Sequence, residues 1–260
     1  MKIATWNVNS VRSRLAAVID WLETNPVDVL CLQETKVVDA DFPREPFLMA
    51  GYQVAISGQK SYNGVAIITR EPSQQVLADF GAVLDKVPPE LDAQKRVITS
   101  AIADFWVVNL YVPNGSAPDS EKYDYKLRWL ACLKEYLEKL KQEKELCVVG
   151  DFNIALENID IYKSEGRDTH IMSTPPERAA LREILDIGLQ DSFRKFTTEG
   201  GHFSWWDYRA GGFARNRGWR IDHIYLTPGL YERATDCVID KTPRGLPKPS
   251  DHTPVIVTLN

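Results

Sequence analysis

The sequence predicts an α/β sandwich, in which two β-sheets pack face to face and helices cover their outer sides. Two observations indicate this class. Apolar strand-like runs alternate with amphipathic helical stripes along all 260 residues, with no linker, repeat or low-complexity tract between them. Several short strands in the first half also have spacings that suit antiparallel hairpins. The two halves of the chain would each form a sheet, and the two sheets would pack against each other. We therefore expect one domain over residues 1–260.

Three helices are expected from apolar residues at helical spacing. The first covers residues 11–22, directly after the first strand. The second covers residues 127–140 and carries lysine and glutamate on its other face, and the third covers residues 178–187. Each stripe can cover the outer face of a sheet.

The expected strands are short apolar runs. They cover residues 2–6, 27–32, 52–56, 64–69, 97–102, 106–111, 146–149 and 254–259, and a further strand is expected to end with Arg220-Ile221, just before Asp222. The run 146–149 consists only of Leu, Cys and Val, which is typical of a strand buried on both faces. We expect Gly150, which follows it, to let the backbone turn.

Polar side chains stand beside six of the apolar segments. They are Asn7 and Asn9, Gln33 and Glu34, Tyr111 and Asn114, Asp151 and Asn153, Asp222, and Asp251 with His252. A single Asp-x-Asn of this kind would be explained by a turn in which both side chains bond their own backbone. Six such sets favour one polar site beyond the ends of the strands, where α/β sheets bind ligands.

Composition narrows the class of protein. The hydrophobic and charged contents, 44% and 26%, are ordinary for a globular chain, and no stretch approaches the ~20 apolar residues of a membrane helix. The chain starts directly in a strand and its four cysteines are widely spaced, so we expect a cytoplasmic protein with reduced thiols. The net charge of −5 argues weakly against nucleic acid, although a local basic rim can still contact phosphates.

Several kinds of active site are missing from the sequence. It contains no Walker loop, no glycine-rich dinucleotide fingerprint, no Gly-x-Ser-x-Gly elbow and no histidines at zinc-ligand spacing. Carboxylates, amides and one well-placed histidine, His252, are what is left. Oxygen ligands select hard cations, chiefly Mg²⁺ or Mn²⁺, and such a metal typically serves phosphoryl chemistry.

Six motifs together resemble the exonuclease III family, the abasic-site endonucleases of DNA base-excision repair in the endonuclease/exonuclease/phosphatase superfamily. In family order they are Trp6-Asn7-Val8-Asn9, Cys31-Leu32-Gln33-Glu34-Thr35-Lys36, Tyr111-Val112-Pro113-Asn114-Gly115, Gly150-Asp151-Phe152-Asn153, Trp219-Arg220-Ile221-Asp222-His223 and Ser250-Asp251-His252-Thr253-Pro254. The resemblance implies a four-layer α/β sandwich, Mg²⁺ dependence with Mn²⁺ as a possible substitute, and cleavage 5′ to abasic sites. It also implies 3′-to-5′ exonuclease and 3′-phosphatase or phosphodiesterase activity on double-stranded DNA with damaged 3′ ends, by a monomer that needs no membrane.

The resemblance also implies roles for the polar residues. Glu34 is the leading metal ligand, and Asp251 and Asn9 are further ligands, directly or through water; relatives vary between Asp and Asn at the position of Asn9. The catalytic set is Asp151, His252, Asp222, Tyr111, Asn153 and Asn7. Asp222 would orient His252, which then either activates water or, protonated, holds the phosphate. Asp151 is the competing group for water activation or for protonating the leaving oxygen.

Substrate recognition is expected in residues 203–220, where aromatic side chains alternate with arginines, a composition that suits bases, sugars and phosphates. By resemblance, Trp205, Trp219 and Ile221 would wall a pocket for a flipped-out baseless sugar. Asn114 would bind the phosphate. The remaining expected DNA contacts are Arg209 and Tyr62.

Two other functions stay open at this point. A related phosphatase or phosphodiesterase would act on inositol phosphates or sphingomyelin, but the aromatic and arginine-rich segment counts against it. A decayed relative that only binds DNA would have lost a metal ligand or the histidine, and the sequence retains them all. Residues 162–176, which include His170 and Met172, match no pattern and leave the balance of the activities undecided.

Overall fold

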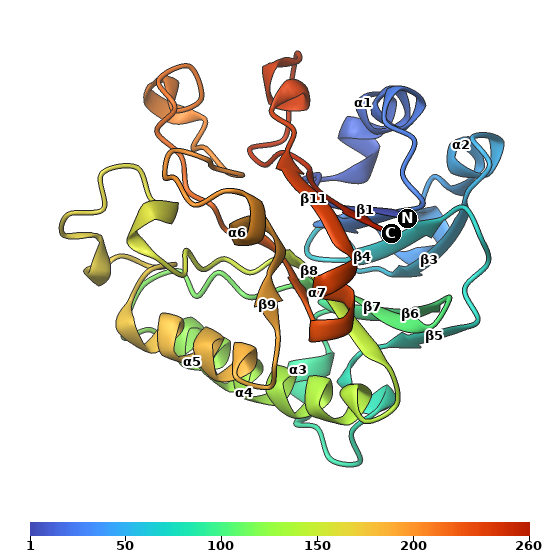
Figure 1. The fold of residues 1–260 in the computed structure, drawn as a ribbon, viewed down its shortest axis with the longest axis horizontal. Helices are drawn as coiled ribbons and strands as arrows, with labels where there is room; N and C mark the ends of the chain where they lie inside the picture. The colour runs from blue at the N-terminus through green and yellow to red at the C-terminus, as the bar shows by residue number, and fades with distance from the viewer.

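Two six-stranded mixed sheets pack face to face in the computed structural model, which describes all 260 residues. The first sheet has the order β11-β12-β1-β2-β4-β3 and the second has the order β5-β6-β7-β8-β10-β9. Figure 1 shows α1 and α2 outside the first sheet and α3, α4 and α5 outside the second, so the molecule has four layers. The predicted α/β sandwich is confirmed. No helix has both the length and the apolar character needed to cross a membrane.

The elements have the following bounds. The first sheet consists of β1 (Lys2–Asn7), β2 (Val29–Gln33), β3 (Gln53–Ser57), β4 (Val65–Thr69), β11 (Ala234–Ile239) and β12 (Val255–Leu259). The second sheet consists of β5 (Gln75–Ala78), β6 (Val97–Ile102), β7 (Phe105–Tyr111), β8 (Glu145–Asp151), β9 (Gln190–Asp191) and β10 (Asp222–Leu226). The helices are α1 (Val11–Thr24), α2 (Arg44–Met49), α3 (Pro89–Asp92), α4 (Glu121–Lys141), α5 (Pro175–Leu185), α6 (Ser192–Phe196) and α7 (Pro228–Arg233).

The predicted hairpins form, but the sheets do not divide the chain at its middle. β3 pairs antiparallel with β4, and β6 pairs antiparallel with β7. The last strand, β12, returns to the first sheet and pairs antiparallel with β1, with Ile3 opposite Val257. The chain termini therefore lie side by side in Figure 1. This return brings the segment before β12 to the end of β1.

The structure adds β5, β9 and β11 to the predicted strands and moves the start of the third predicted helix. β5 is a largely exposed edge strand and β9 has two residues, so neither has an apolar pattern that the sequence could reveal. α5 begins at Pro175, three residues before the predicted start. Thr174 and Glu177 form a reciprocal capping box there, and proline is favoured in the first helical turn.

The core has three apolar layers, one between the sheets and one beneath each helical layer. A buried polar pair also joins the sheets. Gln33 Nε2 donates to Asn109 Oδ1 at 2.7 Å, and Asn109 Nδ2 donates to the carbonyls of Leu32 and Ala66 at 3.0 and 2.9 Å. Because buried amides are costly unless they are bonded, this pair favours one register between the ends of β2 and β7.

The chain leaves several strands through left-handed residues. Asn9, Glu34 and Asn153 have φ of 46°, 51° and 49°, which costs a non-glycine residue of order 1 kcal/mol. Gly150 differs from the prediction, because it lies inside β8 and not in a turn. Its φ is 146°, and a Cβ there would lie 2.1 Å from the carbonyl oxygen of Leu110 on β7. Glycine is needed for this close approach, and the turn comes later, at Asn153.

Candidate active site

The polar strand ends meet at one edge of the sandwich. Asn7 ends β1, and Asp151 ends β8 in the other sheet. Asp222 lies opposite Asp151, because β10 runs antiparallel to β8. The residues before Asp222 were expected to form a strand that ends there, but β10 begins at Asp222. The antiparallel direction brings the start of β10 to the same edge as the end of β8.

The side chain of Asn7 joins the two sheets. Its Nδ2 donates to Glu34 Oε1 and to Asp151 Oδ2, both at 2.9 Å. Its Oδ1 accepts from the backbone N–H of Asn9 at 3.0 Å. One neutral amide therefore holds two carboxylates close together without adding charge, one from each sheet. The carboxylates themselves repel, so they are held for a purpose other than stability.

His252 lies between two carboxylates and is buried. Its Nδ1 is 2.8 Å from Asp222 Oδ2, and its Nε2 is 3.7 Å from Asp151 Oδ2. Burial opposes a charge on His252, but Asp222 and Asp151 outweigh it and raise its pKa to about 10. In the metal-free molecule the ring is therefore an imidazolium at neutral pH, with Nδ1–H donated to Asp222.

Asp151 is the carboxylate whose proton affinity is most changed. Burial, reinforced by Asp222 and Glu34, raises its pKa to about 7, although His252 and the Asn7 hydrogen bond oppose the shift. The Asp151 oxygens also accept from the backbone N–H of Asn153 at 2.9 Å and from Asn153 Nδ2 at 3.2 Å. A carboxyl group that titrates near neutrality and is aimed into a polar site can take or give a proton there.

The amides of Asn153 and Asn114 are connected. Asn114 Nδ2 donates to Asn153 Oδ1 at 3.0 Å, and Asn153 Nδ2 donates to the carbonyl of Val112 at 3.0 Å. Asn153 is buried, whereas Asn114 is exposed. Asn114 thus presents a polar group at the mouth of the site, and Asn153 holds it there.

Glu34 lies on the more open side of the site, and its environment suits a cation. The ammonium of Lys36 is 2.8 Å from Glu34 Oε2 and 2.5 Å from Asn9 Oδ1. Asn9 Nδ2 in turn donates to Asp251 Oδ1 at 3.1 Å. Two oxygens that converge on one ammonium form a place where a small hard cation could bind. The residues predicted to hold a metal, Glu34, Asn9 and Asp251, thus belong to one connected set.

A second group of possible metal ligands shares Glu34 with this connected set. Glu34, Asp151 and His252 each offer one atom within 4.8 Å of the others, and Asp251 lies outside this group. Burial opposes the charge of Asp251, but His252 and the hydrogen bonds from Trp205 and Asn9 lower its pKa. Asp251 is therefore ionised at neutral pH and can attract a cation through Asn9 or through water.

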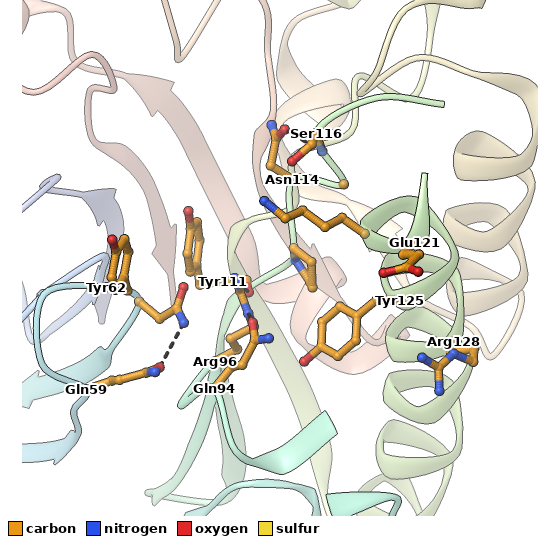
Figure 2. A pocket seen from close by; sticks show the side chains of 14 residues that line it. Gln59, Tyr62, Gln94, Arg96, Tyr111, Asn114, Ser116, Glu121, Tyr125 and Arg128 are labelled. Atoms are coloured by element: carbon orange, nitrogen blue, oxygen red, sulfur yellow. Dashed lines mark hydrogen bonds between the residues drawn. The ribbon is translucent and has the colours of Figure 1, made fainter. Parts of the chain in front are cut away.

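Tyr111 and Tyr62 line a cavity of about 620 Å³ beside the site. Figure 2 shows Tyr62 on one side, Tyr111 and Arg96 in the middle, and Tyr125 on the opposite side. Burial, Glu34 and Asp151 raise the pKa of Tyr111 well above its usual value and outweigh the Arg96 guanidinium, 4.7 Å from its ring. Tyr111 is therefore a hydrogen-bond donor at neutral pH. Tyr62 is 69% exposed at the rim.

The predicted pocket residues also come together. The buried side chains of Ile221, Ile161 and Met172 form a small apolar cluster, and Trp205 and Trp219 pack at its edge. The backbones of the two tryptophans pair, and Trp205 Nε1 donates to Asp251 Oδ2 at 3.1 Å. Met172 comes from the segment that matched no pattern, whereas His170 of the same segment is exposed.

Arg209 is not brought into this network. It is exposed at the start of a short 3-10 turn and forms no ion pair in the chain. The neighbouring Tyr208 is the residue that contacts the site, because its hydroxyl lies 3.5 Å from Asp251 Oδ1 and donates to the carbonyl of Pro249 at 2.9 Å. Arg14 adds a contact that no sequence pattern predicts, since it donates to the carbonyls of Asn9 and Pro249 at 2.6 and 3.2 Å.

Known proteins share this architecture over the whole chain. Residues 4–252 match the Endonuclease/Exonuclease/phosphatase family. Exodeoxyribonuclease III of Haemophilus influenzae is 36% identical, over 98% of each chain. The 3′ phosphatase NExo from Neisseria, bound to a product DNA hairpin, has a TM-score of 0.95 at 39% identity and covers 100% of this chain and 99% of its own. An AP endonuclease from Archaeoglobus fulgidus has a TM-score of 0.94 at 42% identity, with the same coverage.

Proposed function

The chain belongs to the Endonuclease/Exonuclease/phosphatase family, and on that basis we propose that it is a metal-dependent DNA-repair hydrolase of phosphodiester bonds. Its substrates would be double-stranded DNA with abasic sites, cut on the 5′ side, and DNA with damaged 3′ ends. We further propose 3′-to-5′ exonuclease and 3′-phosphatase or phosphodiesterase activity, which the relatives named for these activities support. The observation that carries the proposal is the set of Asn7, Glu34, Asp151, Asp222 and His252 at the ends of both sheets, joined by hydrogen bonds and by the His252–Asp151 ion pair.

The residues present fit a magnesium ion, with manganese as a substitute. The fit rests on the oxygens of Glu34 and Asn9 that converge on the Lys36 ammonium, and on the ionised Asp251 beside them. Glu34 would bind the ion, with Asn9 and Asp251 as direct ligands or through water. When bound, the ion would supply charge stabilisation to the phosphate and the leaving oxygen.

Asp151 would be the group that takes the proton from the attacking water. The two alternatives for this role are His252 and Asp151, and the raised pKa of His252 leaves it without an accepting nitrogen at neutral pH. A carboxyl group with a pKa near 7 is well matched to proton transfer at that pH. His252, protonated and oriented by Asp222, would hold a phosphate oxygen through Nε2–H.

The amides and the phenol would position the phosphate. Asn7 keeps Asp151 and Glu34 in place, Asn153 orients Asp151, and Asn114 donates from the mouth of the site. Tyr111 would donate its hydroxyl proton to the same phosphate, because its pKa keeps it protonated. None of these groups adds negative charge beside an anionic substrate.

The aromatic cluster would accept the baseless sugar. Trp205, Trp219 and Ile221 belong to one apolar cluster next to Asp251 and would wall the sugar site, and extrusion from the duplex costs least where no base is stacked. A second cavity of about 310 Å³ is lined by Trp219 together with Lys163, Arg167 and Arg217. No carboxylate lines it, so it would supply part of the basic rim for DNA phosphates. Tyr62 and Arg209 would touch the duplex outside the site.

We propose that residues 1–260 act as one domain and as a monomer. The two sheets share an apolar core, and site residues come from both of them, so neither sheet would form the site alone. The four cysteines are free and buried, which suits the reducing environment of the cytoplasm.

The test is a nicking assay on duplex DNA with one abasic site. We expect metal-dependent cleavage 5′ to the site by the wild type, and loss of cleavage in Asp151→Ala and His252→Ala. Rates on an internal abasic site, a 3′-phosphate and a matched 3′ end would give the balance of activities. Full activity in both variants would exclude the assignment, and cleavage only of inositol phosphates or sphingomyelin would favour the other branch of the superfamily.

A further inference from the structure

A lysine and a glutamate are completely buried beneath the site. Lys126 on α4 and Glu177 on α5 both have no exposed side-chain surface, and Lys126 Nζ lies 2.5 Å from Glu177 Oε1. Burial lowers the pKa of Lys126, although Glu177 opposes the shift. Buried ion pairs are seldom more stable than apolar residues of the same volume. Stability alone therefore does not explain why charges occupy this position.

The ammonium of Lys126 binds the backbone of two site residues. It donates to the carbonyl of Asn153 at 2.8 Å and to the carbonyl of Asn114 at 3.2 Å. Asn153 has the left-handed φ of 49°, so its peptide orientation needs outside support. Lys126 thus holds from behind the two amides whose side chains are bonded to each other at the front.

Glu177 binds the opposite wall of the site. Its Oε1 accepts from the backbone N–H of Met172 at 3.0 Å, and its Oε2 accepts from Thr174 N and Oγ1 at 3.0 and 2.7 Å. Met172 also has a left-handed φ, 73°, and its side chain belongs to the apolar cluster of Ile221, Trp205 and Trp219 that is proposed to form the wall of the sugar pocket. Glu177 therefore fixes the segment that supplies this pocket wall.

We propose that Lys126 and Glu177 are positioning residues that hold the phosphate-facing amides at a fixed distance from the sugar pocket. The ion pair connects the two, because its cation binds the carbonyls of Asn114 and Asn153 and its anion binds the N–H of Met172. The inference rests on the proposed function, which requires a phosphate and a sugar to be held at the same time. Neither residue touches the substrate, so both act through the groups that they hold.

The test compares charge removal with charge imbalance. Lys126→Met leaves Glu177 buried and unpaired, so the midpoint of thermal unfolding should fall. In Lys126→Met/Glu177→Gln no unpaired charge is left, and the glutamine carbonyl can still accept from Thr174 in the capping box, so most of the midpoint should return while Met172 loses its acceptor. We expect kcat on abasic duplex DNA to stay about 10- to 100-fold low in the double variant, with KM within about twofold of the wild type. Lys134→Met, which breaks an exposed ion pair on the same helix, is the control.

Hydrogen exchange gives a readout that does not depend on turnover. The backbone amides near Asn153 and Met172 should exchange faster in the double variant, while those of β1 should not change. A double variant that recovers kcat together with its thermal midpoint would overturn the inference and leave the proposed function standing. A wild type that does not nick abasic DNA would instead overturn the proposed function, and unchanged exchange at Asn153 and Met172 would then overturn the inference as well.

Discussion

The two halves of the site differ in burial and in what their carboxylates do. Asp151, Asp222 and His252 are sealed from solvent, whereas the side chains of Glu34 and Lys36 are 18% and 26% exposed. The same contrast separates Asp151, whose pKa is raised by burial, from Asp251, whose pKa is lowered by His252 and by hydrogen bonds. Two aspartates in one site thus favour opposite protonation states because their surroundings differ.

This difference teaches how one edge of a sandwich can serve two kinds of chemistry. A proton carrier needs a dry, crowded place, because only desolvation and nearby charge move a pKa to neutrality. A cation that must exchange with solvent needs a wetter place with ionised oxygens. In the proposed function the first lies at β8 and β10 and the second at the turns after β1 and β2, with Asn7 hydrogen-bonded to both Asp151 and Glu34.

The largest effect should come from the buried half of the site, which consists of Asp151, Asp222 and His252. Asp222→Asn removes the charge that keeps His252 protonated and replaces one of the two oxygens that face its Nδ1–H with an NH2 donor, so we expect kcat to fall about 10²- to 10⁴-fold. The metal concentration that gives half of the maximal rate should change little. Steady-state nicking over a range of metal concentrations measures both quantities. Recovery of the rate at high metal would contradict the division into two halves.

Glu34→Gln should show the opposite behaviour. Losing one ionised oxygen weakens cation binding, so we expect the half-saturating metal concentration to rise about 10- to 100-fold. The rate should approach that of the wild type once metal is saturating. The same titration tests this, with Asp222→Asn as the matched comparison. A loss of rate that no metal concentration restores would assign Glu34 to the proton chemistry.

The stability of the metal-free protein should fall as pH rises through neutrality, because of the buried half. His252 has a pKa of about 10 in the folded state against about 6.5 unfolded. The stability that it contributes is complete below about pH 6.5 and is lost as pH rises towards 10. Asp151, raised to about 7, acts in the same direction between about pH 4 and 7, since the folded state again binds the proton more tightly.

Urea unfolding with a chelator present, at a series of pH values, checks this dependence. One proton gives a slope of at most about 1.4 kcal/mol per pH unit. The difference between the wild type and His252→Gln isolates the contribution of the histidine and its partners. A difference that grows as pH rises from 7 to 10 would show that the sign is wrong.

The smallest effect belongs to the open half. Lys36→Met removes the ammonium that competes for Glu34 and Asn9, so metal should bind more tightly. Exposed ion pairs contribute up to about 1 kcal/mol, which limits the gain to roughly fivefold in half-saturating metal. Isothermal titration of Mg²⁺ into the DNA-free protein measures it. Weaker binding would mean that Lys36 supports the cation site and does not compete for it.

The sequence predicts best those site residues that are unusual in their local sequence. An apolar strand followed by Glu34 or Asp151 is unusual, because a charge there is costly unless it is paired, and these residues do meet. The three main helices followed from their apolar stripes, since each covers one face of a sheet. Arg209 shows the limit of this reasoning, because an arginine among aromatic residues can equally well face solvent.

No local sequence pattern predicts the contacts of several other residues. Lys126 looks like a lysine on the solvent face of a helix until α5 packs over it and buries it against Glu177. Arg14 and Tyr208 acquire their partners only when the segment before β12 returns to β1. Asp222 lies beside His252 as predicted, but at the start and not the end of its strand, because a period of two residues does not reveal strand direction. These features depend on tertiary contacts between distant segments.

The left-handed residues at the strand ends also matter for protein design. Glu34 and Asn153 reach the site because the backbone bends sharply at each of them, and an ideal strand would point their side chains elsewhere. A graft that copied only the polar side chains onto regular strands of another scaffold would therefore scatter them. A transferable unit has to include the bends, the close approach at Gly150 and the neighbouring strand that makes this approach possible.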